Sequence, residues 1–196
     1  MPVDPAPLNS VGDLVLRDAR SMRALTDPLR LTLFDLVRRE GPVSSGALAQ
    51  STDRDQATVV DRLRELESLG FVEKTAGEDG EVRWKTEAKG IYFEIPDDPP
   101  GQLAARQLSK MMMTRYAELP ASWAGGEEPK LDLEWARAAG MFNARLDLAP
   151  DELRGIQEGL EQLLEPFTTR PATERPAGVA PVRILCFFMP EAERDT

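Results

Sequence analysis

The order of short elements in the first half of the chain most constrains its fold. Ser44 suits the N-cap of a short helix, SGALAQS, and a polar turn, TDRD, separates it from a longer helix at about 55–69. The apolar positions of the longer helix recur at helical spacing, at Val59, Leu63 and Leu66. Gly70 ends this helix, and two short strands follow around a Gly-flanked acidic tip, Glu78-Asp79. This order predicts a helix-turn-helix followed by a hairpin wing.

Two helices are expected before this unit and one after it. Apolar residues recur over 11–25 with the spacing of a helix. The second helix begins at Asp27-Pro28, an N-cap followed by proline at the first helical position. Thr86 suits the N-cap of a final helix that starts TEAKG. Together these elements predict an α+β, mainly α, winged domain over residues 10–95, with an unrelated small α+β domain as the alternative.

Residues 18–93 also contain two longer motifs, Asp-Pro-Leu-Arg at 27–30 and Leu-Gly-Phe-Val at 69–72. With the sequences around them, these motifs resemble the ArsR-type winged helix-turn-helix transcriptional regulators. The resemblance implies a bacterial regulator that binds double-stranded DNA as a homodimer. It also implies that 55–69 is the recognition helix in the major groove and that the wing, 71–86, lies on the DNA backbone.

The metal-sensing branch of that family uses a Cys-x-Cys motif, or histidine and carboxylate sites on flanking helices. This sequence has no histidine and one cysteine, Cys186. Soft and borderline metals prefer thiolate and imidazole ligands, so we expect no metal site. We expect no cofactor either.

The outward side of the predicted recognition helix supplies most of the candidate DNA contacts. The full set is Ser44, Ser45, Arg54, Gln56, Ala57, Thr58, Val60, Arg64, Arg83 and Lys85. Arg54 and Arg64 suit guanine edges or phosphates, and Gln56 suits adenine. Ala57 or Val60 suits a thymine methyl group. The hydroxyl side chains are phosphate donors, and the two wing cations are expected along the DNA backbone.

Acidic residues weaken this interpretation. Asp53, Asp55 and Asp61 place carboxylates where the ArsR-type pattern commonly has serine or a base, although Asp55 also suits the N-cap of the helix. The net charge of the chain is −10, but residues 11–92 hold 13 basic and 15 acidic side chains, a net of −2. The remaining −8 lies in the terminal regions, so the charge does not exclude a DNA partner. The alternative is a winged-helix protein-interaction module that does not bind DNA.

Proline-rich stretches divide the chain into three parts. Residues 1–9 are expected to form a loose arm, and the break at 95–101 precedes a C-terminal dimerisation or ligand-sensing region at 96–196. In that region the patterns predict helix, strand, helix and strand at 102–119, 141–148, 150–167 and 182–189.

An apolar stripe on the helix at 102–119 is the predicted dimer interface. It consists of Leu108, Met111, Met112, Tyr116 and Leu119. Core packing and a ligand pocket are the alternatives, because methionine adapts to all three settings. A two-fold dimer suits the reading of two DNA half-sites. Trp123 and Trp135 border the middle loop and leave open an unidentified small-molecule effector as a further partner.

The sequence argues against an enzyme and against membrane insertion. It carries no Gly-rich phosphate loop and no nucleophile motif, so no catalytic residue is assigned. The start of the chain lacks the basic and apolar regions of a secretory signal, and the apolar run at 182–189 is too short to span a bilayer. We therefore expect a cytoplasmic protein with no membrane partner.

Overall fold

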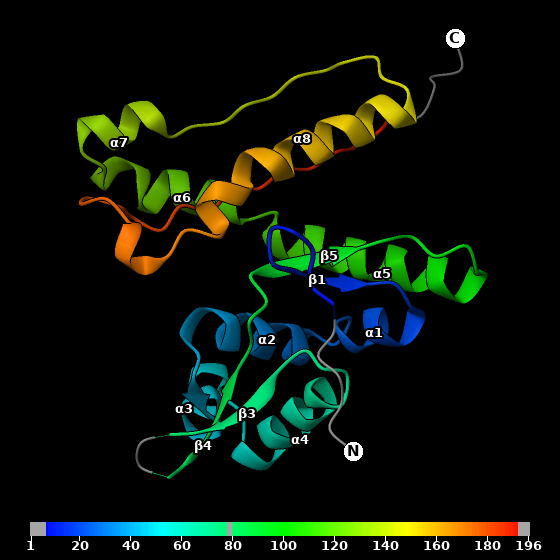
Figure 1. Cartoon of the computed structure of the whole chain (residues 1–196), viewed down its shortest axis with the longest axis vertical. Helices are drawn as coiled ribbons and strands as arrows, with labels where there is room; N and C mark the ends of the chain where they lie inside the picture. Colours follow the sequence, from blue (N-terminus) through cyan, green and yellow to red (C-terminus); the bar gives the residue numbers. More distant parts are fainter. Residues whose placement is uncertain (1–6, 78–79, 192–196) are drawn as a thin grey trace.

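The computed structural model describes residues 7–77 and 80–191, and in this part the chain is α+β and mainly helical (Figure 1). The N-terminal elements are β1 (Asp13–Leu16), α1 (Ala19–Ala24), α2 (Pro28–Glu40), β2 (Val43–Ser44), α3 (Ser45–Thr52), α4 (Gln56–Glu67), β3 (Glu73–Ala76), β4 (Val82–Lys85) and β5 (Gly90–Phe93). The C-terminal elements are α5 (Pro99–Tyr116), α6 (Leu119–Gly126), the 3-10 turn Glu128–Lys130, α7 (Leu133–Ala138), α8 (Pro150–Thr168) and the 3-10 turn Ala172–Glu174.

Two small sheets organise the first half of the chain. Strand β4 lies between β2 and β3, and both pairings are antiparallel. Strands β1 and β5 pair in parallel, with Leu14 opposite Ile91. Figure 1 shows the three-stranded sheet with α3 and α4 at one end of the long axis, and α6, α7 and α8 towards the other.

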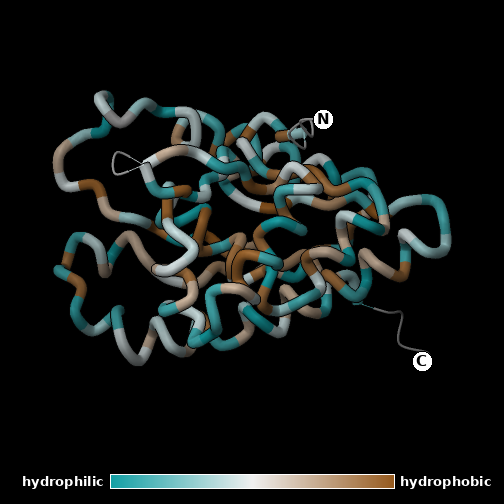
Figure 2. The backbone as a smooth tube through the Cα atoms, turned by 90° about the horizontal axis from the view of Figure 1, so that it is seen from below, coloured by the Kyte–Doolittle hydropathy of each residue, from teal (hydrophilic) through white to brown (hydrophobic). Residues whose placement is uncertain are grey.

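The hydrophobic core lies between α1, α2, α4, α5 and both sheets. It contains the fully buried Phe34 and Phe71, whose rings meet edge to face with centroids 6.4 Å apart. Trp84 of β4 and Leu108 of α5 are buried in the same cluster. Figure 2 shows apolar segments of the backbone concentrated towards the middle of the molecule.

The predicted caps of three helices are confirmed. Asp27 accepts a hydrogen bond from the backbone N–H of Arg30 at the start of α2, which has proline at its first position. Ser44 and Asp55 cap α3 and α4 in the same way. Short polar side chains at these positions satisfy N–H groups that a helix cannot pair internally, so they mark where it begins.

The predicted helix at 11–25 is wrong in its first half. Residues 13–16 form β1, and a helix starts only at Ala19, after Asp18 has accepted hydrogen bonds from two backbone N–H groups. Leu14, Val15 and Leu16 are consecutive buried residues, which suits a strand covered on both faces. The parallel partner β5 comes from the distant segment 90–93. Its hydrogen bonds make residues 13–16 a strand, although their local apolar pattern also fits a helix.

The predicted helix after Thr86 is also wrong. Thr86 does accept a hydrogen bond from the backbone N–H of Ala88, but the chain then continues into β5. In the N-terminal arm, residues 7–9 are attached to β1: Val15 donates to the carbonyl of Pro7, and Leu8 bridges Leu14. Residues 1–6 of the arm lie outside the described residues.

In the C-terminal region the predicted helices are present and the predicted strands are not. Helices α5 and α8 match the patterns at 102–119 and 150–167 within a few residues. Residues 141–148 and 182–189 form neither a helix nor a strand. An alternating pattern forms a strand only when another backbone supplies hydrogen bonds, and none does within the described residues. The proline- and glycine-rich stretch at 120–130 contains most of α6, and α7 follows it.

Gly101 offers a test of how α5 joins the core. A Cβ built there would lie 2.6 Å from the ring carbons of Pro96, a rigid neighbour. We expect Gly101→Ala to lower the free energy of unfolding by about 1–3 kcal/mol, since overpacking forces the backbone to shift. Urea unfolding of the full chain measures this. Gly125→Ala is the control because its added Cβ has no neighbour within 4 Å, and an equal loss there would contradict the overpacking explanation.

Candidate nucleic-acid interface

Helix α4 separates a buried side from an exposed side, as the sequence predicts. Val59, Leu63 and Leu66 are fully buried. The opposite side and the turn before it expose Arg54, Gln56, Ala57, Asp61 and Arg64. The structure therefore brings four predicted contact residues and Asp61 together on one outward face, while the core fixes the other side of the helix.

Asp55 orders the start of α4. Its carboxylate accepts hydrogen bonds from the hydroxyl of Thr58 at 2.6 Å and from the backbone N–H of Thr58 at 2.8 Å. These hydrogen bonds hold the pKa of Asp55 below its usual value, because they stabilise the charged carboxylate. The Thr58 hydroxyl was predicted as a phosphate donor, but here it donates its hydrogen bond to Asp55.

The turn between α3 and α4 presents Arg54 to solvent. Asp53 adopts a left-handed conformation with φ of +51°, and the N–H of Arg54 bonds to the carbonyl of Ala49 at 3.1 Å. Within residues 7–77 and 80–191 the Arg54 side chain makes no ion pair. Its guanidinium is thus available for an outside ligand, just before the exposed face of α4 begins.

The N-terminal end of α3 is linked directly to α4. The Gln56 amide donates to the hydroxyl of Ser45 at 2.9 Å. Ser44 is the N-cap of α3 and accepts from the N–H of Ala47 at 3.2 Å. The three predicted contacts Ser44, Ser45 and Gln56 are therefore neighbours, although eleven positions separate Ser45 and Gln56 in the sequence.

Two ion-pair clusters have different consequences for α4. Arg64 lies 3.4 Å from Asp61 on the exposed face, and both side chains are more than three-fifths exposed. Such a pair contributes little to stability. On the inner edge, Glu65 accepts hydrogen bonds from Arg30 and Arg62, and the contact with Arg30 lowers the pKa of Glu65 below its usual value. This second cluster ties α4 to α2.

The hairpin places its cations on one strand face around a buried tryptophan. Arg83 and Lys85 flank Trp84, which is 2% exposed. The Lys85 ammonium lies 3.0 Å from Glu73 and 3.4 Å from Glu87, and its hydrogen bond to Glu73 raises its pKa. Val60 lies half-buried on α4, at the edge of the exposed face. The acidic tip, Glu78-Asp79, lies outside the described residues.

The predicted dimer stripe on α5 is only partly available to a partner. Leu108 lies inside the core of its own chain, and Met111 and Met112 pack against that core. Tyr116 is half-buried, and burial raises the pKa of its hydroxyl. Leu119 is half-buried at the start of α6.

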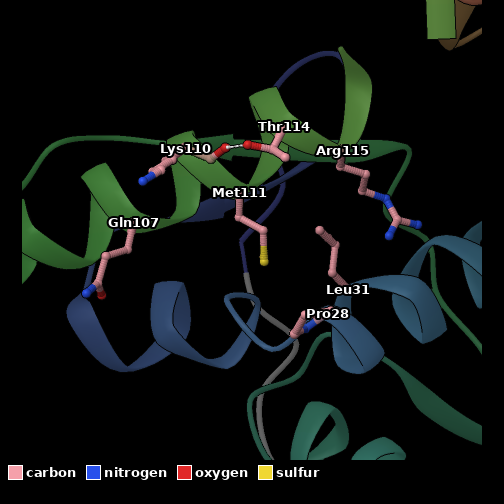
Figure 3. A pocket seen from close by; sticks show the side chains of 7 residues that line it. All are labelled: Pro28, Leu31, Gln107, Lys110, Met111, Thr114 and Arg115. Carbon is pink, nitrogen blue, oxygen red and sulfur yellow. Dashed lines mark hydrogen bonds between the residues drawn. The ribbon is translucent and has the colours of Figure 1, made fainter. Parts of the chain in front are cut away.

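Beside this stripe, α2 and α5 enclose an open hollow of about 420 Å³ (Figure 3). Met111 and Leu31 point towards each other across its apolar floor, and Arg115 lies at one end, bonded to Thr32 and Asp35. The sequence interpretation missed the polar rim residues Gln107, Lys110 and Thr114. Their spacing of three to four positions would have placed them on one helix face.

Other site classes find no support in the described part of the chain. No group of three or more His, Cys, Asp or Glu side chains there is arranged to hold a metal ion. No described helix has both the length and the apolar character needed to cross a membrane. Trp123 and Trp135 are half-buried on α6 and α7, and neither lines the hollow beside α5.

The comparisons with known proteins concern the same part of the chain as the exposed α4 face. A family model described as HVO_A0114 matches residues 25–89. The match runs from just before α2 to just after β4 and covers less than half of the chain. No curated protein matches the sequence.

Proposed function

We propose that the chain is a sequence-specific DNA-binding transcriptional regulator that acts as a homodimer. In this proposal residues 10–95 are a winged helix-turn-helix domain, α4 enters the major groove and the β3–β4 hairpin follows the DNA backbone. The observation that carries it is the outward face of α4, which is exposed, polar and rigidly supported by three buried residues on its other side. The resemblance to ArsR-type regulators supports the same conclusion.

Each exposed residue has a role that its chemistry suits. Arg54 and Arg64 donate to guanine edges or to phosphates, and Gln56 pairs with adenine after leaving Ser45. Ala57 and Val60 contact thymine methyl groups. The Ser44 and Ser45 hydroxyls, with Thr58, lie near phosphates, and Arg83 and Lys85 follow the backbone beside the minor groove.

The test is selection of duplex DNA from a random library by the full-length protein, followed by titration at several salt concentrations. We expect the logarithm of the affinity to fall linearly with the logarithm of salt, with a slope of about −0.9 for each phosphate contacted. Scrambled duplexes of equal length are the control. Failure to enrich any sequence, together with no salt-sensitive binding at low salt, would reject the proposal.

Asp61→Asn should strengthen DNA binding. The change removes a carboxylate from the exposed face and releases Arg64, which it holds at 3.4 Å. One unit charge about 4 Å from another is worth about 1 kcal/mol in water, so we expect about fivefold tighter binding at low salt and a smaller gain at high salt. Titration of the selected duplex measures the change.

The control for Asp61→Asn is Glu134→Gln, which removes the same charge from α7. It should leave the affinity nearly unchanged, since α7 lies away from the interface (Figure 1). If Asp61→Asn weakens binding instead, the carboxylate contacts a base, most simply the amino group of cytosine.

The second candidate is a winged-helix module that binds a protein and not DNA. It is favoured by two sets of ion pairs, because Arg64 pairs with Asp61 and Lys85 pairs with Glu73 and Glu87. These carboxylates compete with DNA phosphates for the two cations. The library selection separates the candidates: enrichment of DNA sites argues against this one. A purified partner that binds in stable stoichiometry, with no DNA enriched, argues for it.

A further inference from the structure

Among the described residues, no side chain after Leu108 is buried, although α6, α7 and α8 all lie in that part of the chain. Thirteen large apolar side chains between Leu133 and Met189 are at least 40% exposed. Ordering a chain costs conformational entropy, which burial must offset. Monomeric proteins rarely expose an apolar patch of more than a few hundred Å². Three of these thirteen side chains, Ile156, Leu163 and Phe167, lie on α8.

Helix α8 turns an apolar face away from its own chain. At 100° per residue, Leu153, Leu160 and Leu164 lie on the half-buried side of its apolar stripe. Ile156, Leu163 and Phe167 lie on the other side and are 41%, 66% and 63% exposed. We call this side, together with the glycines beside it, the open face of α8.

Glu158 and Glu161 lie on the side of α8 away from the open face, about 140–160° around the helix from Leu163 at 100° per residue. The pKa of Tyr92 in β5 is raised first by burial and then by nearby carboxylates, among them Glu161 and Glu158 of α8. Burying the open face against another molecule therefore does not require these two carboxylates to lose their solvent.

Two glycines border the open face within the helix. Gly155 and Gly159 are one turn apart, and a Cβ added at either position would meet nothing within 4 Å. Glycine disfavours a helix interior, and nothing in the chain itself requires it at these positions. Close approach of a second helix would use the space that the missing side chains leave.

We propose that two copies of the chain associate through the open faces of their α8 helices, packed antiparallel about a two-fold axis near position 161. In this register Leu163 of one copy lies on Gly159 of the other, and Phe167 lies on Gly155. Bulky side chains thus meet glycines in four places, which is the large-on-small fit that close helix packing requires. Because the dimer is two-fold symmetric, the open face of each copy is covered by the open face of the other.

Charge fits the same register. Glu152, at the N-terminal end of α8, lies about 20° from Leu163 around the helix at 100° per residue. Arg170 lies two positions after the end of α8, and its guanidinium is 5.0 Å from the centroid of the Phe167 ring, beside the open face. Antiparallel packing places Glu152 of each copy beside Arg170 of the other. The two ends of α8 are therefore complementary to each other, which favours a second copy over an unrelated partner. This inference rests on the homodimer of the proposed function and names its contact surface.

The experiment measures the mass of the full-length protein by sedimentation velocity over a range of concentrations, without DNA. We expect the wild type to form dimers and Gly159→Leu to weaken the dimer at least tenfold. Within one chain the new side chain has open space and better helix propensity, so a purely structural role predicts equal or higher thermal stability. Gly125→Leu, at an equally open position in α6, is the matched control and should not change the dimer.

Charge reversal tests the antiparallel register. Glu152→Arg and Arg170→Glu should each weaken the dimer, and the double variant should regain most of the wild-type affinity. Glu152 also accepts from the N–H of Ala149, a cap that Arg170→Glu does not restore, so recovery reports the contact between copies. A wild type that stays monomeric, or a dimer insensitive to Gly159→Leu, overturns the proposal. A double variant without recovery overturns the register. None of these results decides whether the protein binds DNA, which the library selection tests separately.

Discussion

Replacing Arg54 and Arg64 together by alanine should lower the affinity for the selected DNA duplex by about 30-fold or more. Each well-placed arginine contact to a base edge contributes about 1–3 kcal/mol of discrimination, and 1.4 kcal/mol corresponds to a tenfold change. Both side chains are exposed and project from one face of α4 and its preceding turn. Losing both should remove most of the specific binding while leaving the core of the domain intact.

The salt dependence of the same variant identifies which atoms the arginines contact. If either one binds a phosphate, the slope of affinity against salt should fall by about one for that contact. If both bind guanine edges, the selected and the scrambled duplex should approach equal affinity. Fluorescence anisotropy at three or more salt concentrations distinguishes these outcomes.

The matched control is Arg137→Ala with Arg154→Ala, which removes two exposed positive charges from α7 and α8. This pair changes the net charge equally and leaves α4 untouched. We expect a loss of less than about threefold, since exposed charges beyond a Debye length of about 10 Å are largely screened. Undiminished binding by the Arg54→Ala, Arg64→Ala variant would show that α4 is not the recognition helix.

Trp84→Ala should destabilise the protein by about 3–5 kcal/mol, the usual range for a fully buried tryptophan. Trp84 is 2% exposed and sits on the central strand of its sheet, opposite Val43 of β2 and Lys74 of β3. The Lys74 ammonium lies 4.9 Å from the ring centroid, a cation–π contact that the substitution also removes. The hairpin would lose the side chain that holds it to α2 and α3.

Urea unfolding followed by far-UV circular dichroism measures this loss. Val82→Ala on the same strand is the control, because Val82 is 52% exposed and should change the free energy of unfolding by less than about 1 kcal/mol. Trp84→Phe should fall between the two. Equal stability of Trp84→Ala and Val82→Ala would mean that the hairpin is not anchored through this ring.

The sequence was most informative where structure depends on near neighbours. The caps at Asp27, Ser44 and Asp55 were readable because a helix start requires a side-chain acceptor at one position. The buried side of α4 was readable from the helical repeat. The outward face is the side opposite this repeat, so the same pattern gives the positions of the predicted contact residues on α4.

The features that the sequence did not predict depend on segments that lie far apart along the chain. The 11–25 pattern fitted a helix, but β5, more than seventy positions away, pairs with residues 13–16 and makes them a strand. The contact between Gln56 and Ser45, and the cluster in which Glu65 meets Arg30 and Arg62, depend on how α2, α3 and α4 cross. No spacing within one helix specifies that crossing.

By itself, the sequence determined the helices α2, α3, α4, α5 and α8, the three confirmed caps and the division of α4 into a buried and an exposed side. These properties follow from backbone geometry over a few residues. Only the tertiary structure decided the parallel β1–β5 pair, the burial of Leu108 in its own chain and the exposure of the open face of α8. Strand pairing and burial depend on which distant segment lies against a surface. A local sequence pattern shows that a face is apolar, but it does not show what covers that face.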